Sequence, residues 1–229
     1  MKFNFDFLTD WTVDIVNAVY RLTIQSLYFI LSNSLFLMML LVFKMTLNNF
    51  ILFLVPIFLM LISFLTQFTI NEAGKGPLAF KAYCRLYQRN LKSQWQMSVF
   101  YTLLIAFLVF DFRILSVLKN GLLYVPFLIT SGFLISSLFF MILIATDARS
   151  KQLSLGRKFF SALLIAYRLP LVTLVNMICL VGIAISLVLF PIAYICILGG
   201  LINYLIYLNC QCRFSVSLYF GDVSGKIGF

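Results

Sequence analysis

The sequence predicts an all-α fold, a polytopic transmembrane helical bundle of about six spans with interfacial amphipathic helices on the cytoplasmic side. Of the 229 residues, 63% are hydrophobic and only 10% are charged. Soluble domains carry roughly 25% charged residues, so no soluble fold of this length could bury so much apolar surface. The apolar residues also fall in runs of the length that a membrane-spanning helix needs, about 20 residues. We therefore expect a single transmembrane domain over residues 1–229.

The chain divides into predicted spans in order. Residues 1–21 suit an interfacial lead-in, because Trp11 belongs at the headgroup level and no short apolar core with a cleavage site follows. The last apolar region, 159–210, is too long for one span, and we divide it at Pro191. The predicted spans are 22–43, 50–68, 97–112, 121–145, 171–190 and 192–208. The predicted cytoplasmic loops are 69–95 and 146–168.

The distribution of positive charge predicts the orientation. Every Lys and Arg except Lys44, Arg113 and Lys119 falls in the termini and the two long loops, which leaves fourteen of the 17 on one side. Short loops rich in Lys and Arg stay in the cytoplasm. We therefore expect a multi-pass protein of the bacterial cytoplasmic membrane with both termini inside the cell and very short outer loops.

Several classes of protein are disfavoured by what the sequence contains. It has no His, so it lacks the commonest general base and metal ligand. No carboxylate lies in the middle of a predicted span, and no Gly-Lys-Ser/Thr loop is present to hold a nucleotide. The net charge of +10 is explained by retained cytoplasmic loops rather than by nucleic-acid binding. We expect a protein that is not an enzyme and that uses no cofactor or metal.

The cysteines do not suggest a metal site either. None of the five forms a C-x-x-C pair, and Cys210 with Cys212 would supply only two ligands. Whether the Cys210–Cys212 pair is modified stays open at this stage.

Each of the two long loops contains an amphipathic helix next to a span. Aromatic residues of the first loop recur at three- and four-residue steps and are flanked by Lys and Arg, which is typical of a helix on anionic headgroups or on a cytoplasmic partner. Phe80 and Arg89 are nine residues apart, as are Phe159 and Arg168, so either a parallel repeat or two similar interfacial helices would explain the pattern. The candidate residues for lipid or partner contact are Phe80, Tyr83, Arg85, Tyr87, Arg89, Asn90, Phe159, Arg168 and Pro170.

Three asparagines lie inside predicted spans. Asn33, Asn176 and Asn203 are neutral, and such groups most often hydrogen-bond between helices. The alternative is that the three side chains line an intramembrane polar pocket for a neutral ligand such as a sugar.

The order of motifs resembles the YesL family of small bacterial integral membrane proteins, a family without an established activity. An N-terminal Phe5-Asp6-Phe7 precedes an aromatic first span, and Asp111 closes the third. The segment Phe80-Lys81-x-Tyr83, continued by Tyr87-x-Arg89-Asn90-Leu91-Lys92, follows the second span, and Phe159-Phe160 with Tyr167-Arg168-Leu169-Pro170 comes later. The resemblance implies an accessory role in carbohydrate uptake, because such proteins are often encoded beside carbohydrate ABC importers.

These observations favour an accessory membrane subunit of a carbohydrate (oligosaccharide) ABC importer that acts through protein–protein contacts rather than catalysis. The expected partners are membrane lipids and other membrane proteins, such as the permease subunits. The alternative is a membrane transport protein, or a substrate-binding component for a small neutral solute. The chain is less suited to be the permease itself, because the second loop lacks the Glu-Ala-Ala start of the loop that docks on the ATPase. An enzyme acting on lipids or glycan lipid carriers would need clustered ionisable groups near one face. The expected cytoplasmic face has the cations, but the only carboxylates nearby are Glu72 and Asp147.

Overall fold

The computed structural model describes residues 5–43, 46–73, 78–118, 121–216 and 219–220. Every regular element within these ranges is a helix, as the sequence predicts. In chain order the elements are α1 (Phe5–Ser32), α2 (Ser34–Val42), η1 (Phe50–Phe53), α3 (Leu54–Glu72), α4 (Phe80–Leu118), α5 (Gly121–Thr146), η2 (Ala148–Gln152), α6 (Leu155–Arg168), α7 (Pro170–Leu189), α8 (Pro191–Ala193), η3 (Tyr194–Leu198) and α9 (Gly199–Gln211).

The described residues contain five helices that are long and apolar enough to cross a bilayer. Helices α1 and α2 are each too short or too polar to be counted alone, but together they are long and apolar enough, with a bend of 61° between them. If they form one broken span, the count is six. The fifth helix runs from Pro191 through the π-helical η3 to Gln211. The last apolar region is divided at Pro191, where a proline at the first helical position begins α8.

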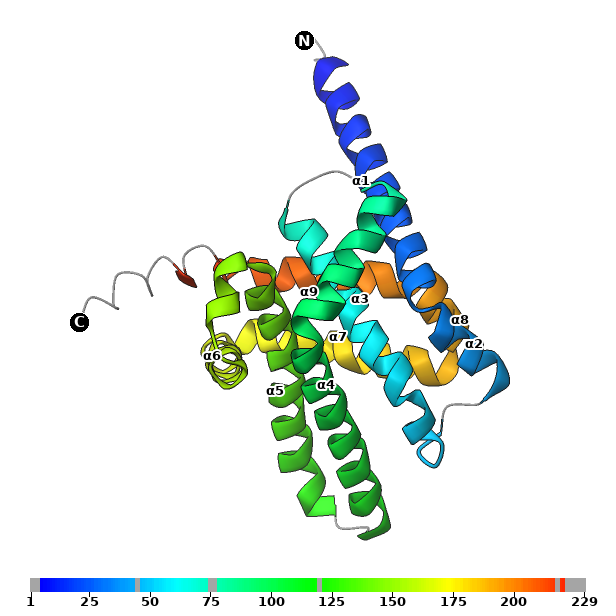
Figure 1. The fold of residues 1–229 in the computed structure, drawn as a ribbon, viewed down its shortest axis with the longest axis vertical. Coiled ribbons are helices and arrows are strands. Elements are labelled where there is room, and N and C mark those ends of the chain that lie inside the picture. The colour runs from blue at the N-terminus through cyan, green and yellow to red at the C-terminus, as the bar shows by residue number, and fades with distance from the viewer. Residues whose placement is uncertain (1–4, 44–45, 74–77, 119–120, 217–218, 221–229) are drawn as a thin grey trace, which may run out of the picture.

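The bend between α1 and α2 is centred on Asn33. Its backbone leaves the helical region, at φ −106° and ψ 19°. Its side-chain Nδ2 donates to the carbonyl of Phe29 at 2.8 Å, one turn earlier. A side chain that bonds the preceding turn competes with the regular helical ladder and bends the helix. Within the expected lead-in at 1–21, the described residues from Phe5 onward are continuous with the rest of α1, whose N-terminal part stands away from the other helices (Figure 1).

Helix α4 joins a predicted loop helix and a predicted span into one element of 39 residues. The helix is kinked at Gln94, where φ is −124° and ψ is 18°. Beyond the kink α4 pairs with α5, and the two form a hairpin that extends below α7, which runs across it in the view of Figure 1. Ring contacts between the helices include Phe112 with Tyr124 at 6.2 Å and with Phe127 at 6.4 Å.

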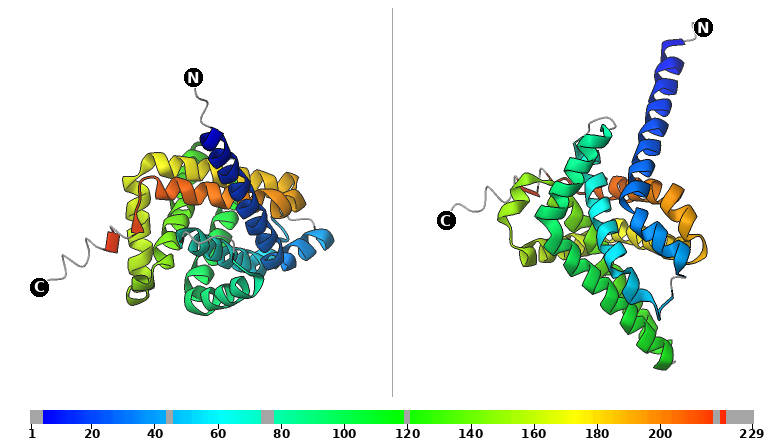
Figure 2. Two further views of the ribbon diagram at one scale, coloured as in Figure 1. Left: turned by 90° about the horizontal axis from the view of Figure 1, so that it is seen from above. Right: turned by 45° about the vertical axis from the view of Figure 1, so that its right-hand side comes forward.

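The chain returns from the hairpin through η2 and α6, and α7 and α9 then lie side by side. Both views in Figure 2 show this pair crossing α3 and α5 rather than running parallel to them. Aromatic side chains pack between α1, α3, α5 and η3: Phe29 meets the rings of Phe64 at 5.6 Å and Tyr194 at 6.3 Å, and Phe64 in turn meets Phe139 at 6.4 Å. Helices α1, α3, α5 and η3 therefore share one core.

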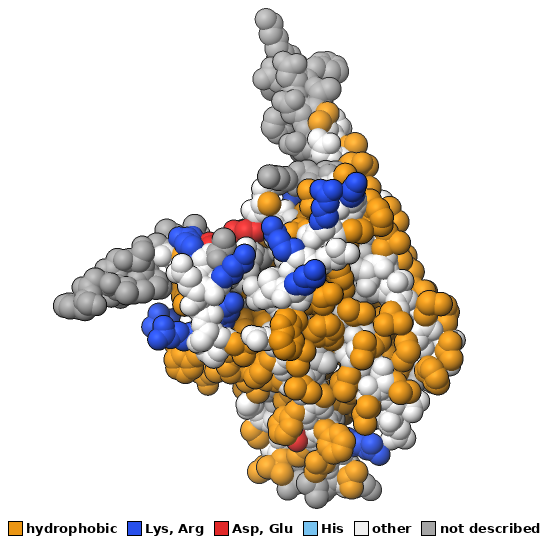
Figure 3. All heavy atoms as spheres, viewed as in Figure 1, with side chains coloured by type: hydrophobic (Ala, Val, Ile, Leu, Met, Phe, Trp, Pro, Cys, Tyr) orange, Lys and Arg blue, Asp and Glu red, His pale blue; other side chains and the backbone are white. Residues whose placement is uncertain are grey.

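Hydrophobic side chains also cover much of the outside of the bundle, as the lower part of Figure 3 shows. Large exposed examples occur on α2, α4, α5, α7 and α9. Soluble monomers rarely expose continuous apolar patches of this kind, whereas helices in a bilayer must. The surface is therefore compatible with a membrane protein.

Helix α9 approaches α1 closely at Gly199 and Gly200. A Cβ on Gly200 would stand 2.5 Å from Ser26 Oγ and 3.0 Å from Ser26 Cα, and a Cβ on Gly199 would clash with the ring of Phe29. Small residues at helix crossings let two backbones pack together where lipid supplies no hydrophobic driving force. The Gly199–Gly200 pair thus sets the distance between the first and last long helices.

We expect Gly200→Ala to lower the free energy of unfolding by about 1–3 kcal/mol, because the backbone of Ser26 must move to accept the added methyl group. The measurement is unfolding of the purified protein in mixed detergent micelles. Gly182→Ala is the matched control, since a Cβ there meets no atom within 4 Å. The control should be neutral or more stable by about 0.5–1 kcal/mol, and equal losses in the two variants would contradict the close approach.

Candidate functional site

Exposed Lys and Arg side chains gather on one side of the molecule. Figure 3 shows them over the first half of α4 and over α6, above the hydrophobic surface. We call this surface the cationic face. It consists of Lys81, Arg85, Arg89, Lys92, Arg149, Lys151, Arg157, Arg168 and Arg213, all of which are exposed.

The candidate contact residues on α4 divide between this face and the interior. Phe80, Arg85 and Arg89 are exposed, whereas Tyr83 and Asn90 are buried and Tyr87 is half-buried. This division follows the turn of the helix, because residues three and four apart share a face.

The inward-facing residues of α4 bind neighbouring helices. The Tyr83 ring stacks on Tyr28 of α1 at 4.4 Å, and its hydroxyl lies 3.0 Å from that of Ser32. The Asn90 side chain donates to Thr66 Oγ1 of α3 at 3.2 Å, and the Tyr87 hydroxyl donates to the carbonyl of Leu59 at 3.3 Å. These three side chains therefore attach α4 to the bundle.

The candidate residues of the second loop divide in the same way. The half-buried ring of Phe159 packs between Phe100 at 5.1 Å and Tyr101 at 6.2 Å, both on α4. Arg168 is exposed and is the last residue of α6, and Pro170 is the first residue of α7. Arg168 is thus the member of this group that projects from the cationic face.

The three intramembrane asparagines are buried in three different places. Asn33 pairs with its own helix at the bend. Asn176 Oδ1 accepts from Asn209 Nδ2 at 2.8 Å, which links α7 to α9. Asn203 donates to Gln67 Oε1 of α3. The structure does not bring the three together, and none of them lines a cavity considered below.

Asn203 belongs instead to a polar cluster between α1, α3 and α9. Gln67 Nε2 donates to the backbone carbonyl of Gln25 at 3.0 Å. Asn71 Oδ1 accepts from Gln25 Nε2 at 2.6 Å and from Arg21 Nη2 at 3.0 Å. We call Arg21, Gln25, Gln67, Asn71 and Asn203 the amide cluster. It joins three helices that lie far apart in the sequence.

The amide cluster continues toward the end of α9. Glu72 Oε2 accepts hydrogen bonds from the hydroxyl of Tyr207 at 3.2 Å and from Gln211 Nε2 at 2.7 Å. The guanidinium of Arg21 lies 5.9 Å from the centre of the Tyr204 ring. A cation near an aromatic face gains stabilisation of about 0.5–2 kcal/mol, more where water is excluded.

Not every polar atom of the amide cluster has a partner. Arg21 Nε, Gln25 Oε1, Asn71 Nδ2 and Asn203 Oδ1 are buried without a hydrogen bond to any described residue. Buried polar groups of proteins are nearly always bonded to protein or water, so these donors and acceptors have bonding capacity left for a water molecule or another polar group.

The sequence interpretation singled out Asn203 alone from this cluster. The missed signal is a step of four residues, which places side chains on one helical face: Arg21 with Gln25, and Gln67 with Asn71. On α9 the same step relates Asn203, Tyr207 and Gln211. Three polar stripes on otherwise apolar helices predict that the stripes face one another, although not which stripe meets which.

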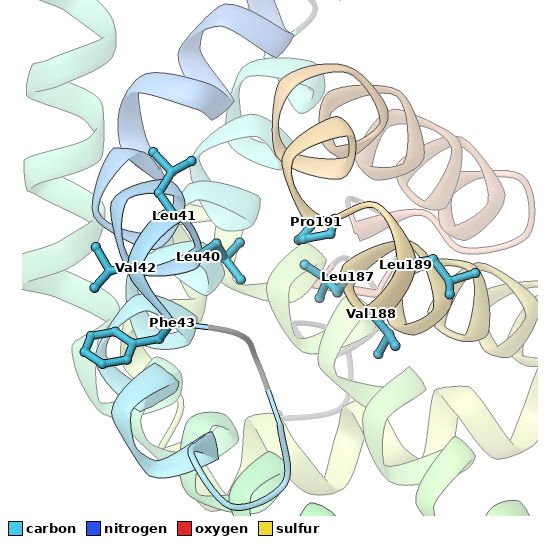
Figure 4. Close-up of a pocket in the computed structure, with 8 residues that line it drawn as sticks. All are labelled: Leu40, Leu41, Val42, Phe43, Leu187, Val188, Leu189 and Pro191. Carbon is cyan, nitrogen blue, oxygen red and sulfur yellow. The ribbon is translucent and has the colours of Figure 1, made fainter.

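A separate apolar cavity of about 410 Å³ lies between the end of α2 and the turn from α7 to α8. Figure 4 shows Leu40, Leu187 and Pro191 facing one another across it, while Val42 and Phe43 point away. Every lining side chain is hydrophobic, so the polar part of the cavity surface comes from the backbone and no side chain is placed there for catalysis.

We compared the chain with protein-family models, with characterised proteins and with solved structures, and none of them matches it.

Gln67→Leu and Asn203→Leu should each lower the free energy of unfolding by about 1–3 kcal/mol, because each leaves a buried amide without its partner. The double variant should lose less than the sum of the two, with a coupling of at least about 0.5 kcal/mol. Gln88→Leu on the exposed side of α4 is the control and should change stability by less than about 0.5 kcal/mol. If the loss in the double variant equals the sum of the two single losses, the Gln67–Asn203 hydrogen bond contributes nothing to stability.

Proposed function

We propose that this chain is a multi-pass protein of the bacterial cytoplasmic membrane with both termini in the cytoplasm. The cationic face supports this orientation, since positively charged loops are retained inside the cell. The exposed hydrophobic side chains on α4, α5 and α7 would then face lipid or the spans of another protein.

Within that membrane the chain acts as a non-catalytic accessory subunit that binds the permease subunit of a carbohydrate ABC importer. The hairpin of α4 and α5 carries this proposal. It extends beyond α7 and exposes large apolar side chains, with Phe107 64% and Phe110 59% accessible. In a bilayer, van der Waals packing between helices contributes to their association, and a protruding hairpin is accessible for such packing with neighbouring spans. The resemblance to the YesL family suggests the importer as the partner.

A photo-crosslinking experiment tests this contact. A benzophenone amino acid is introduced in place of Phe107 in one variant and of Val181 in another, and the chain is expressed at native level in its own membrane. Val181 is the matched control because it is an exposed apolar residue of α7, at 57% accessible. We expect a crosslink to an importer permease, identified by mass spectrometry, from position 107 and lipid adducts alone from position 181. Lipid adducts alone at both positions, together with purification of the chain by itself in mild detergent, would reject the proposal.

The amide cluster favours a second candidate function, binding of a small neutral polar solute. The unpartnered Gln25 Oε1, Asn71 Nδ2 and Asn203 Oδ1 supply two acceptors and a donor in one buried region, the combination that hydroxyl groups of a sugar require. Arg21 and Tyr204 would add a cation and an aromatic ring beside them.

Cysteine accessibility tests the second candidate. With the five native cysteines replaced by alanine, Asn203→Cys should react with a small hydrophilic methanethiosulfonate reagent if a polar path reaches the amide cluster. Ile206→Cys is the control, because Ile206 lies three residues away in the same helix and is fully buried among apolar side chains. Protection of both thiols would rule out a solute path through the cluster.

A further inference from the structure

The kink of α4 creates a polar recess on the cationic face. Gln94 leaves the helical conformation, and its side chain is only 7% exposed yet has no hydrogen-bond partner among the described residues. It lines a cavity of about 310 Å³ and also a neighbouring cavity of about 110 Å³. Ser93 and Lys151 line both cavities as well, so the two are adjacent, and we call them together the kink cavity.

Lysine side chains from two different elements meet at the kink cavity. Lys151 comes from η2 and is exposed, whereas Lys158 comes from the first turns of α6 and is 7% exposed. No described residue forms an ion pair or hydrogen bond with the ammonium group of Lys158. Burial lowers the pKa of Lys158 from its ordinary value, because a charge in a poorly hydrated site is disfavoured. The ammonium group of Lys158 is thus partly desolvated and has no described partner.

The carboxylate that lines the kink cavity is already paired with an arginine. Asp147 lines the smaller part, and its Oδ2 pairs with Arg149 Nη2 at 2.8 Å while its Oδ1 accepts from Arg149 Nε at 3.1 Å. This pairing holds the pKa of Asp147 below its usual range. The bidentate contact leaves the positive charge of Lys151 and Lys158 available to an external anion.

Apolar residues also line the kink cavity. They are the buried Met97 of α4 and Met141 of α5, together with Leu153 and Leu155. The cavity therefore combines cationic and hydrogen-bonding side chains with apolar ones. The start of α6 lies at its edge, and the N-terminal end of a helix also favours negative charge.

We propose that the kink cavity binds a phosphate group, with Lys158 and Lys151 as its cations and the side chains of Gln94 and Ser93 as hydrogen-bond donors. A phosphate has the charge and the acceptor oxygens that two ammonium groups and an amide satisfy together. Two sources share this chemistry, the headgroup of an anionic phospholipid and a soluble phosphate. The site is independent of the subunit contact proposed for the α4–α5 hairpin.

The test measures thermal unfolding of the full chain in an uncharged detergent while a ligand is titrated. One arm adds inorganic phosphate, with sodium chloride at matched ionic strength as its control. The other arm adds short-chain phosphatidic acid, with the short-chain diacylglycerol that lacks the phosphate as its control. A ligand that binds the folded state raises the midpoint temperature in proportion to its saturation. We expect the midpoint to rise in at least one phosphate arm and in neither control, and the responding arm identifies the source.

Two variants locate the site. Lys158→Met should leave the midpoint without ligand unchanged or higher, because it removes a partly desolvated charge that has no described partner and keeps a long apolar side chain. The same variant should raise the phosphate concentration needed for half of the temperature rise at least about tenfold, the effect of losing one charge-assisted hydrogen bond. Arg157→Gln removes the same charge from the adjacent, exposed position of α6 and should respond like the unmodified chain. Lys151→Gln, on the exposed rim, serves as the second site variant if Lys158→Met does not fold.

Two results would overturn the proposal. One is the absence of any phosphate-dependent rise in both arms. The other is an equal loss of response in Lys158→Met and Arg157→Gln. That result would mean that phosphate binds through the overall charge of the cationic face and not in the kink cavity.

Discussion

The structure depends on hydrogen bonds that join apolar helices through a few buried amides. Gln67 of α3 lies at the centre, because it bonds Asn203 of α9 and the backbone of Gln25 on α1. In hydrocarbon such a bond contributes only about 0.6 kcal/mol on average, yet an unpaired amide is much more costly. This asymmetry restricts the packing to arrangements in which the polar stripes meet. Gly199 and Gly200 allow that arrangement by letting α9 approach α1 closely.

Buried polar side chains also hold the long helix α4 in place. Its first half carries the charges of the cationic face on one side and uses Tyr83, Tyr87 and Asn90 to attach to α1 and α3 on the other. Past the kink at Gln94 the helix becomes almost wholly apolar and pairs with α5. One helix therefore links the polar surface to the hairpin proposed to contact a partner. The kink cavity lies where these two environments meet.

Much of the fold follows from local sequence. Long apolar runs predict the helices, because a run of about 20 hydrophobic residues has few other stable conformations in a bilayer. Pro191 ends one helix and begins the next, and the structure divides the last apolar region there. In the candidate site, the helical step predicts which side chains of α4 share a face, but not that Tyr83, Tyr87 and Asn90 face inward.

Other features arise only from contacts between distant segments. No local pattern showed that Asn33 would bend the first span, or that Arg21 would contact Asn71 fifty residues later. The kink cavity likewise brings α4, α5, η2 and α6 together. The sequence by itself determined the helical class, the apolar lengths and the uneven distribution of charge, because each depends on residues close along the chain. Only the tertiary structure decided which polar stripes meet and where Lys158 is buried, since pairing depends on the packing of all the helices at once.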